Sequence, residues 1–183
     1  MEHPAKIPVQ FVQLQSEDIC LELFQDFHRR QVVDLCWRKI DGRWQQKPDP
    51  FIDDWSQEDY AFLVSCLQNT VRTGGLVLGA FVDGRLKGFT SVEPGLFGKN
   101  QEYLDLSSVH VSEELRGQGV GRELIRRVKE WAKAQGARKL YISAHSAAET
   151  QAFYKAMGCV EAEEYNMAHA EKEPFDCQLE CPL

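Results

Sequence analysis

The sequence lacks both an excess of basic residues and any long apolar run. Its 21 Lys and Arg residues are outnumbered by 28 Asp and Glu residues, which gives a formal net charge of −7. Nucleic-acid-binding proteins present a basic face, so this composition argues against a nucleic-acid partner. No apolar stretch approaches the roughly 20 residues of a membrane span, and the opening Met1-Glu2-His3-Pro4 does not resemble a secretory signal. We therefore predict a cytoplasmic protein that does not associate with a membrane.

The sequence also lacks the cysteine spacing of a metal site or a disulfide framework. Its cysteines are widely separated, and Cys177 and Cys181 have neither a second pair nor a histidine cluster near them in the sequence. Structural zinc sites require four ligands at regular spacing. The pattern predicts reduced thiols, most of them in the core, and no bound metal ion. The six cysteines are Cys20, Cys36, Cys66, Cys159, Cys177 and Cys181.

The length and hydrophobic content favour one domain spanning residues 1–183. A chain of 183 residues, of which 43% are hydrophobic, can bury one good core. In the first third of the chain, alternation predicts a strand over 9–14, and Ser16 offers a cap for a helix that carries Ile19 and Leu23. The apolar residues of 32–37 continue that helix or begin a second one. Prolines and Asp41-Gly42 predict a loop over most of residues 37–56.

The rest of the chain alternates helices and strands, which predicts a mixed α/β fold with a largely antiparallel sheet. Asp83-Gly84 is a strong signal for a two-residue hairpin turn. The expected helices cover about 56–72, 120–135 and 147–157. The expected strands cover 76–82, 85–92, 103–111, 139–144, 160–165 and 176–181, with a polar loop at about 168–174.

A glycine-rich segment, Leu115-Arg116-Gly117-Gln118-Gly119-Val120-Gly121, lies between the strand over 103–111 and the helix that follows it. Alternate glycines let a ligand approach the backbone, and the free N–H groups of the first helical turn attract a phosphate. No Lys-Ser or Lys-Thr follows the glycines, which argues against a nucleotide-hydrolysing P-loop. The dinucleotide fingerprint requires an early parallel unit, which is missing. The glycines alone also fit a plain tight turn.

Two motifs resemble the GCN5-related N-acetyltransferase (GNAT) superfamily. The first is Arg116-Gly117-Gln118-Gly119-Val120-Gly121, which is similar to the family's acyl-CoA pyrophosphate loop. The second is Ala152-Phe153-Tyr154-Lys155-Ala156-Met157-Gly158-Cys159, which resembles its helix with a tyrosine and a following turn. The resemblance covers about 76–165. It implies helices on both faces of a mixed, mostly antiparallel sheet, with a splayed cleft for CoA between two strands.

The resemblance also implies the cofactor-binding residues. In the family, the strand before the loop pairs with pantetheine, and the loop holds the pyrophosphate. Carried onto this sequence, the acetyl-CoA site comprises Val109, His110, Val111, Arg116, Gly117, Gln118, Gly119, Val120, Gly121, Arg122, Ser146 and Tyr154. The sequence departs from the family at Ala147, where many relatives have a cofactor-binding asparagine, and at Cys159, where the turn usually has an aromatic residue. Ser146 and Glu149 are candidates to replace the asparagine.

For catalysis, the resemblance implies that Tyr154 protonates the departing thiolate, a role that suits a phenol with a pKa near 10. A general base is less well defined. Asp105 is the first choice, because on an unbulged strand it shares a face with Val109. Glu93 is the second candidate, and Glu102 is a further alternative. The lone strand histidine, His110, fits a structural role better than a catalytic one, and His145 is treated in the same way.

We therefore expect an N-acetyltransferase that moves an acetyl group from acetyl-CoA to a primary amine. A catalytically inactive CoA-binding or sensor module and an unrelated phosphate-binding domain are the alternatives. The acceptor is not identified by the sequence. Aromatic residues and carboxylates over residues 37–60 would suit a cationic amine, but they also fit a capping loop. Pairing of an exposed closing strand leaves a homodimer open. The aromatic residues are Trp37, Trp44, Phe51 and Trp55.

Overall fold

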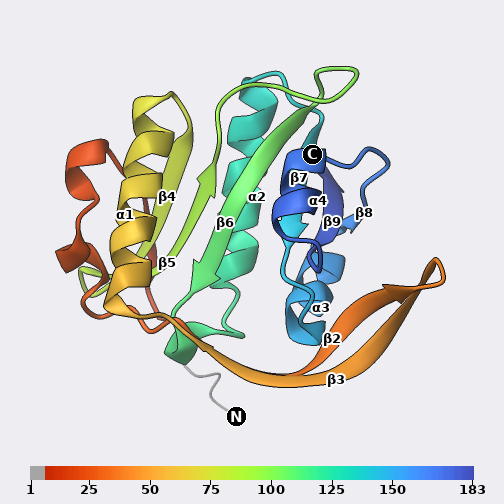
Figure 1. Cartoon of the computed structure of the whole chain (residues 1–183). Coiled ribbons are helices and arrows are strands. Elements are labelled where there is room, and N and C mark those ends of the chain that lie inside the picture. Colours follow the sequence, from red (N-terminus) through yellow and green to blue (C-terminus); the bar gives the residue numbers. More distant parts are fainter. Residues whose placement is uncertain (1–6) are drawn as a thin grey trace, which may run out of the picture.

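A computed structural model describes residues 7–183, so the polar segment Met1-Glu2-His3-Pro4 lies outside the described residues. A seven-stranded sheet forms the centre, with α1 against one face and α2 against the other (Figure 1). The sheet has the order β1-β4-β5-β6-β7-β9-β8. Its strands are β1 (Gln10–Gln13), β4 (Leu76–Val82), β5 (Arg85–Val92), β6 (Tyr103–Val111), β7 (Lys139–Ala144), β8 (Val160–Glu161) and β9 (Cys177–Pro182).

The sheet is antiparallel except where β6 and β7 run side by side in the same direction. These two strands pair only through Tyr103–Asp105 and Lys139–Tyr141. Beyond that point they separate, and the described strands give the later part of β6 no partner on its β7 side. The predicted mixed sheet with a splayed cleft is therefore confirmed.

The helices follow from local capping and apolar faces. The helix α1 (Gln57–Arg72) begins at a capping box in which Ser56 and Asp59 bond each other's backbone N–H groups. One face of α1 buries Tyr60 and Leu67 against Val77. The helix α2 (Val120–Ala134) packs Leu124 on the other face of the sheet. Beyond β7 lie α3 (Ala148–Ala156) and α4 (Met167–Lys172).

The N-terminal helix prediction is wrong. Residues 16–24 form two short 3-10 turns, Ser16–Asp18 and Leu21–Phe24, which bury Ile19 and Phe24 without a continuous helix. The segment over 32–37 and the expected loop that follows it form a long hairpin of β2 (Arg30–Ile40) and β3 (Arg43–Asp54). Asp41 and Gly42 both have positive φ, as the two-residue turn of a hairpin requires.

The prolines that predicted a loop are accommodated because this hairpin has only two strands. Pro48 and Pro50 lie at a register shift between Val33 and Leu35, where the ladder does not need every N–H donor. Near the other end of the chain, α4 occupies residues expected to be a polar loop, and β8 is only two residues long. No helix within residues 7–183 is long and apolar enough to cross a bilayer.

The hairpin β2–β3 bridges the separated ends of β6 and β7 (Figure 1). Next to β6, Arg29 donates from Nε to Nδ1 of His110 at 3.1 Å. Next to β7, the N–H of Trp37 donates to the carbonyl of Ser146 at 2.7 Å. Cys36 packs on Ala147, which is only 1% exposed. The small side chain at residue 147 thus makes room for the hairpin.

Candidate active site

A cleft of about 710 Å³ opens where β6 and β7 separate. Its walls come from the later half of β6, the glycine-rich segment, the end of β7 and helix α3. The predicted cofactor residues that line it are Val109, His110, Val111, Arg116, Gly117, Gly119, Val120, Gly121, Arg122 and Tyr154. Gln118 and Ser146 do not line it. Gln118 donates to the Glu114 carbonyl, and the Ser146 hydroxyl accepts a hydrogen bond from Arg38.

The glycines shape the floor of the cleft. Gly117 and Gly119 have φ values of 76° and 84°, in the region that favours glycine, and a Cβ added to either would meet no atom within 4 Å. Gly119 is also the N-cap residue of α2, and it offers no side chain to the free N–H groups of the first turn. The third glycine serves packing, since a Cβ on Gly121 would lie 3.1 Å from the ring of Phe153. The helix N-terminus therefore faces open space suited to an anion.

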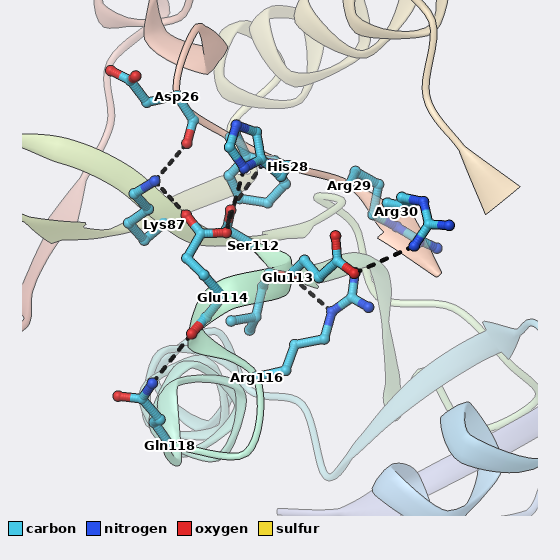
Figure 2. A network of polar contacts seen from close by, with 12 residues as sticks. Asp26, His28, Arg29, Arg30, Lys87, Ser112, Glu113, Glu114, Arg116 and Gln118 are labelled. Carbon is cyan, nitrogen blue, oxygen red and sulfur yellow. Dashed lines mark hydrogen bonds and ion pairs between the residues drawn. The ribbon is translucent and has the colours of Figure 1, made fainter. Parts of the chain in front are cut away.

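A polar network braces the glycine-rich segment (Figure 2). Glu114 pairs with the ammonium of Lys87 and accepts a 2.7 Å hydrogen bond from Ser112. The Ser112 hydroxyl in turn accepts from the N–H of His28 at 2.9 Å. Gln118 donates to the Glu114 carbonyl at 3.2 Å. Sequence reasoning missed Glu114 because Lys87 and His28, which complete the network, are distant from it in the sequence.

We expect Glu114→Gln to weaken acetyl-CoA binding about threefold to fivefold while the protein stays folded, as suits a partly exposed ion pair. Burial raises the pKa of Glu114, but hydrogen bonds from Lys87 and Ser112 outweigh it and lower the pKa to about 2. A lowered pKa means that the bracing is present at neutral pH and is lost as the pH falls toward 2. Calorimetric titration with acetyl-CoA would measure the change, with Glu130→Gln on the outer side of α2 as the control. Equal affinities for the two variants would contradict the bracing role.

Arg29 lies where the hairpin meets the cleft. Its side chain is 10% exposed and pairs with Asp53 through Nη2 at 2.8 Å, but within residues 7–183 its Nη1 has no hydrogen-bond partner. Burial, together with the positive charges of Arg29 and Arg116, lowers the pKa of His110 to about 3. His110 is therefore neutral and accepts from Arg29, which agrees with the structural role expected for it.

Tyr154 lies on α3 and lines the cleft with 7% of its surface exposed. Burial raises the pKa of its phenol well above the ordinary value. The ring of Phe153 meets its ring edge-on, with 5.2 Å between the centroids. The phenol thus stays protonated over the whole neutral range and is able to donate to a bound molecule.

The expected shared face of Asp105 and Val109 is wrong. The register between β5 and β6 shifts between Ser91 and Val92, which leaves Ser107 as an extra residue in β6. This bulge reverses the alternation. Val109 packs with the α2 side of the core, whereas the Asp105 carboxylate accepts a hydrogen bond from His169 on α4, with 2.6 Å between Oδ2 and Nε2.

Neither predicted base lines the cleft. Asp105 contacts His169, whose pKa is raised by that hydrogen bond. Glu93 accepts from Thr70 at 2.8 Å and from Ser107 at 2.7 Å, and only Ser107 reaches the cleft. The third alternative, Glu102, lies 3.9 Å from the Lys139 ammonium, at the far end of β6. Their roles as base stay predictions that this geometry does not favour.

The wall opposite β6 supplies carboxylates that the sequence reasoning missed. Asp176 and Glu173 both line the cleft, between α4 and β9. Burial raises the pKa of Asp176, while a 3.0 Å hydrogen bond from Ser143 partly opposes that rise. His145, at the end of β7, also lines the cleft. In the sequence, these residues are spread over a predicted loop and a strand end, so no local pattern distinguished them.

The aromatic residues proposed for acceptor recognition do not line this cleft. Trp37, Trp44 and Phe51 face the docked side of the hairpin, where Trp44 donates to Glu161 at 3.1 Å. Trp55 packs against His110, with 4.7 Å between ring centroids, and lines a second cavity of about 630 Å³. Arg29 lines both this cavity and the cleft. Of residues 7–75, only Arg29 and Gln31 line the cleft.

Comparisons with known proteins agree with this geometry. The family model described as "Acetyltransferase (GNAT) family" matches residues 29–159. A solved nourseothricin acetyltransferase is 19% identical with a TM-score of 0.70, and the alignment covers 95% of this chain and 98% of that one. An acetyltransferase from Bacillus anthracis str. Ames, in complex with acetyl coenzyme A, is 14% identical with a TM-score of 0.72 and coverages of 96% and 99%. PaiA N-acetyltransferase from Thermoplasma acidophilum, in complex with coenzyme A, is 17% identical with a TM-score of 0.60 and coverages of 96% and 99%. No curated protein sequence matches this chain.

Proposed function

Because the chain belongs to the acetyltransferase (GNAT) family, we propose that it transfers an acetyl group from acetyl-CoA to a primary amine of a small acceptor. The observation that carries this proposal is the uncapped N-terminus of α2, which opens into the cleft between β6 and β7 and lies on the same cleft as Tyr154. An anion site for pyrophosphate and a buried proton donor therefore share one cavity. Transfer is direct, and no covalent enzyme intermediate is involved.

The two ends of the cleft differ in charge, which supports an order for the bound parts. Arg29, Arg116 and Arg122 lie at the end with the glycine-rich segment, where the phosphates of acetyl-CoA would bind. Asp176 and Glu173 lie on the wall between α4 and β9. A cationic amine would be drawn to those carboxylates. The free edge of β6, which includes Val109, offers backbone groups to the amides of the pantetheine arm.

The chemistry divides between two side chains. The amine nitrogen forms a bond to the thioester carbon, and the bond from that carbon to sulfur breaks. The phenol of Tyr154 donates its proton to the leaving thiolate, because its raised pKa keeps it protonated until a strong base appears. Asp176 accepts the proton that the amine loses, directly or through water. The raised pKa of this carboxyl makes it a better base than an exposed aspartate.

We expect Asp176→Asn to lower kcat by roughly 100-fold, since a positioned base contributes about 10²–10⁴-fold, while the affinity for acetyl-CoA is unchanged. Asp105→Asn is the matched variant, because Asp105 lies outside the cleft and contacts His169. It should lower kcat far less. Release of free CoA thiol, followed over a pH series, would measure both effects. If kcat fell further in Asp105→Asn than in Asp176→Asn, Asp105 on β6 would be the better candidate for the base.

The proposed activity is tested by incubating the protein with acetyl-CoA and a panel of amines, and by measuring the masses of the products by mass spectrometry. Nourseothricin leads the panel because a structural neighbour is named as its acetyltransferase; polyamines, amino acids and peptides follow. An acceptor heavier by one acetyl group, with matching release of CoA, is the expected result. Tight binding of acetyl-CoA without transfer to any amine would favour the inactive sensor module, and no binding by folded protein would exclude both.

A further inference from the structure

Two of the free cysteines lie opposite each other behind the cleft. β8 and β9 are antiparallel, with Val160 opposite Glu180 and Glu161 opposite Leu179. Continuing this register by one residue places Cys159 opposite Cys181. Both side chains belong to the same core cluster, with exposures of 7% and 1%.

The hydrogen bonds show which kind of cross-strand pair this is. The N–H of Ala162 donates to the carbonyl of Gln178, so these two residues form a hydrogen-bonded pair. In an antiparallel ladder, such pairs alternate with pairs that exchange no backbone hydrogen bonds. Cys159 and Cys181 lie three residues further along each strand and therefore form a pair of the second kind. Consistently, the N–H of Cys159 donates to the carbonyl of Tyr154 at 3.0 Å and not across the strands. At such positions Cα atoms lie about 4.5 Å apart, within the range that a disulfide can span.

The surroundings favour reaction at one of the two sulfurs. The Cys159 thiol and the Lys129 ammonium lower the pKa of Cys181, against the effect of burial, and the thiolate is the reactive form. Lys129 is held beside β9 by a 2.8 Å hydrogen bond from Nζ to the carbonyl of Pro182. Access requires local opening of β8, which is a two-residue strand at the edge of the sheet and whose Val160 is exposed.

We propose that Cys159 and Cys181 form a reversible disulfide when the folded protein meets a peroxide. The Cys181 thiolate attacks one peroxide oxygen, the O–O bond breaks, and the oxygen that leaves takes up a proton as water. The resulting sulfenic acid is attacked by the Cys159 sulfur, which loses its proton as the S–S bond forms and the S–O bond breaks. A second water leaves with that proton. In sum, two thiols and one hydrogen peroxide give one disulfide and two waters.

The disulfide would act on the wall of the cleft. Cys159 directly follows the turn after α3, and the Cys181 thiol lies 3.5 Å from the carbonyl of Met157, which lines the cleft. The bond also closes the segment that carries α4, Glu173 and Asp176. A closed segment restricts the unfolded chain, so the oxidised protein should unfold at a temperature several degrees higher than the reduced one. This proposal does not depend on the transferase activity.

The test treats the folded protein with hydrogen peroxide, unfolds it, alkylates the remaining thiols and measures its mass. The expected product has lost two hydrogens, keeps Cys159 and Cys181 unalkylated, and regains both thiols with dithiothreitol. Oxidation of Cys66, which is exposed, shows that the oxidant was active. Cleavage after Lys172 leaves Cys177 and Cys181 on one peptide, so the mass of that peptide does not tell which of the two is bonded to Cys159. The variants Cys181→Ser and Cys177→Ser make this distinction.

Cys177→Ser should still lose two hydrogens, whereas Cys181→Ser should not. Fragmentation of the linked wild-type peptides gives the same assignment without any variant, should a substitution prevent folding. Alkylated Cys159 and Cys181 in protein whose Cys66 is oxidised would overturn the proposal. So would a disulfide that survives in Cys181→Ser, or one that joins two copies of the chain.

Discussion

Gly119→Trp is expected to abolish measurable acetyl-CoA binding, a loss of at least about 100-fold. A Cβ at this position points into open space at the N-terminus of α2, so an indole there would occupy the volume proposed for the pyrophosphate. The substitution also forces a non-glycine residue to adopt a φ of 84°, which costs about 1–2 kcal/mol. Calorimetric titration of the folded variant with acetyl-CoA would measure the loss.

Gly84→Trp separates the two effects of that substitution. Gly84 has a φ of 75° in the turn between β4 and β5, and a Cβ there also meets no atom within 4 Å. The backbone strain and the exposure of the indole are therefore similar, but this turn does not line the cleft. Gly84→Trp should lose about as much stability and bind acetyl-CoA normally. If both variants lost binding equally, general destabilisation would explain the result, and the site would have to lie elsewhere.

The elements from β4 to β7 were predictable because their signals are local. The Asp83-Gly84 turn, the alternation of the strand over 103–111 and the apolar spacing of the helix after Gly119 each specify an element within a few residues. The glycine-rich segment was predictable for the same reason, since positive φ and an uncapped helix end depend on residues that are adjacent in the sequence. The structure places every residue of this segment except Gln118 along the cleft.

The features that were missed depend on contacts between distant residues. Residues 30–54 were predicted to form a helix and a loop. Val32, Val33 and Leu35 do not follow the strict alternation of apolar and polar residues typical of a strand, and the prolines disfavour backbone pairing. The hairpin is instead stabilised by docking on Ser146 and Ala147, more than 100 residues away. That docking also accounts for Ala147 in place of the family's asparagine.

The assignment of the base failed for a related reason. Which face a strand residue occupies depends on every residue before it, so one extra residue at Ser107 moved Asp105 to the other side of the sheet. Nothing in Ser107-Ser108 signals a bulge from the sequence alone. Asp176 could be recognised only after folding, because its proximity to the cleft arises from α4 and β9 closing against β7.

Tyr154→Phe is expected to lower kcat by roughly 100-fold, the lower end of the contribution of a positioned acid, with the affinity for acetyl-CoA unchanged. The substitution removes only the hydroxyl and keeps the ring that packs against Phe153, so the variant should fold normally. Single-turnover release of CoA thiol would measure the chemical step. Tyr165→Phe is the control, because Tyr165 bonds Glu161 outside the cleft.

The pH profile distinguishes an acid from a residue that only packs. Burial raises the pKa of Tyr154, so its proton is available at neutral pH and is lost only above the range of an ordinary tyrosine. Wild-type kcat should therefore show no fall from this group up to about pH 10, and Tyr154→Phe should be slower by a constant factor over that range. If Tyr154→Phe instead raised KM for acetyl-CoA and left kcat unchanged, the tyrosine would serve to position the cofactor. The proton for the departing thiolate would then have to come from solvent or from another group in the cleft, such as His145.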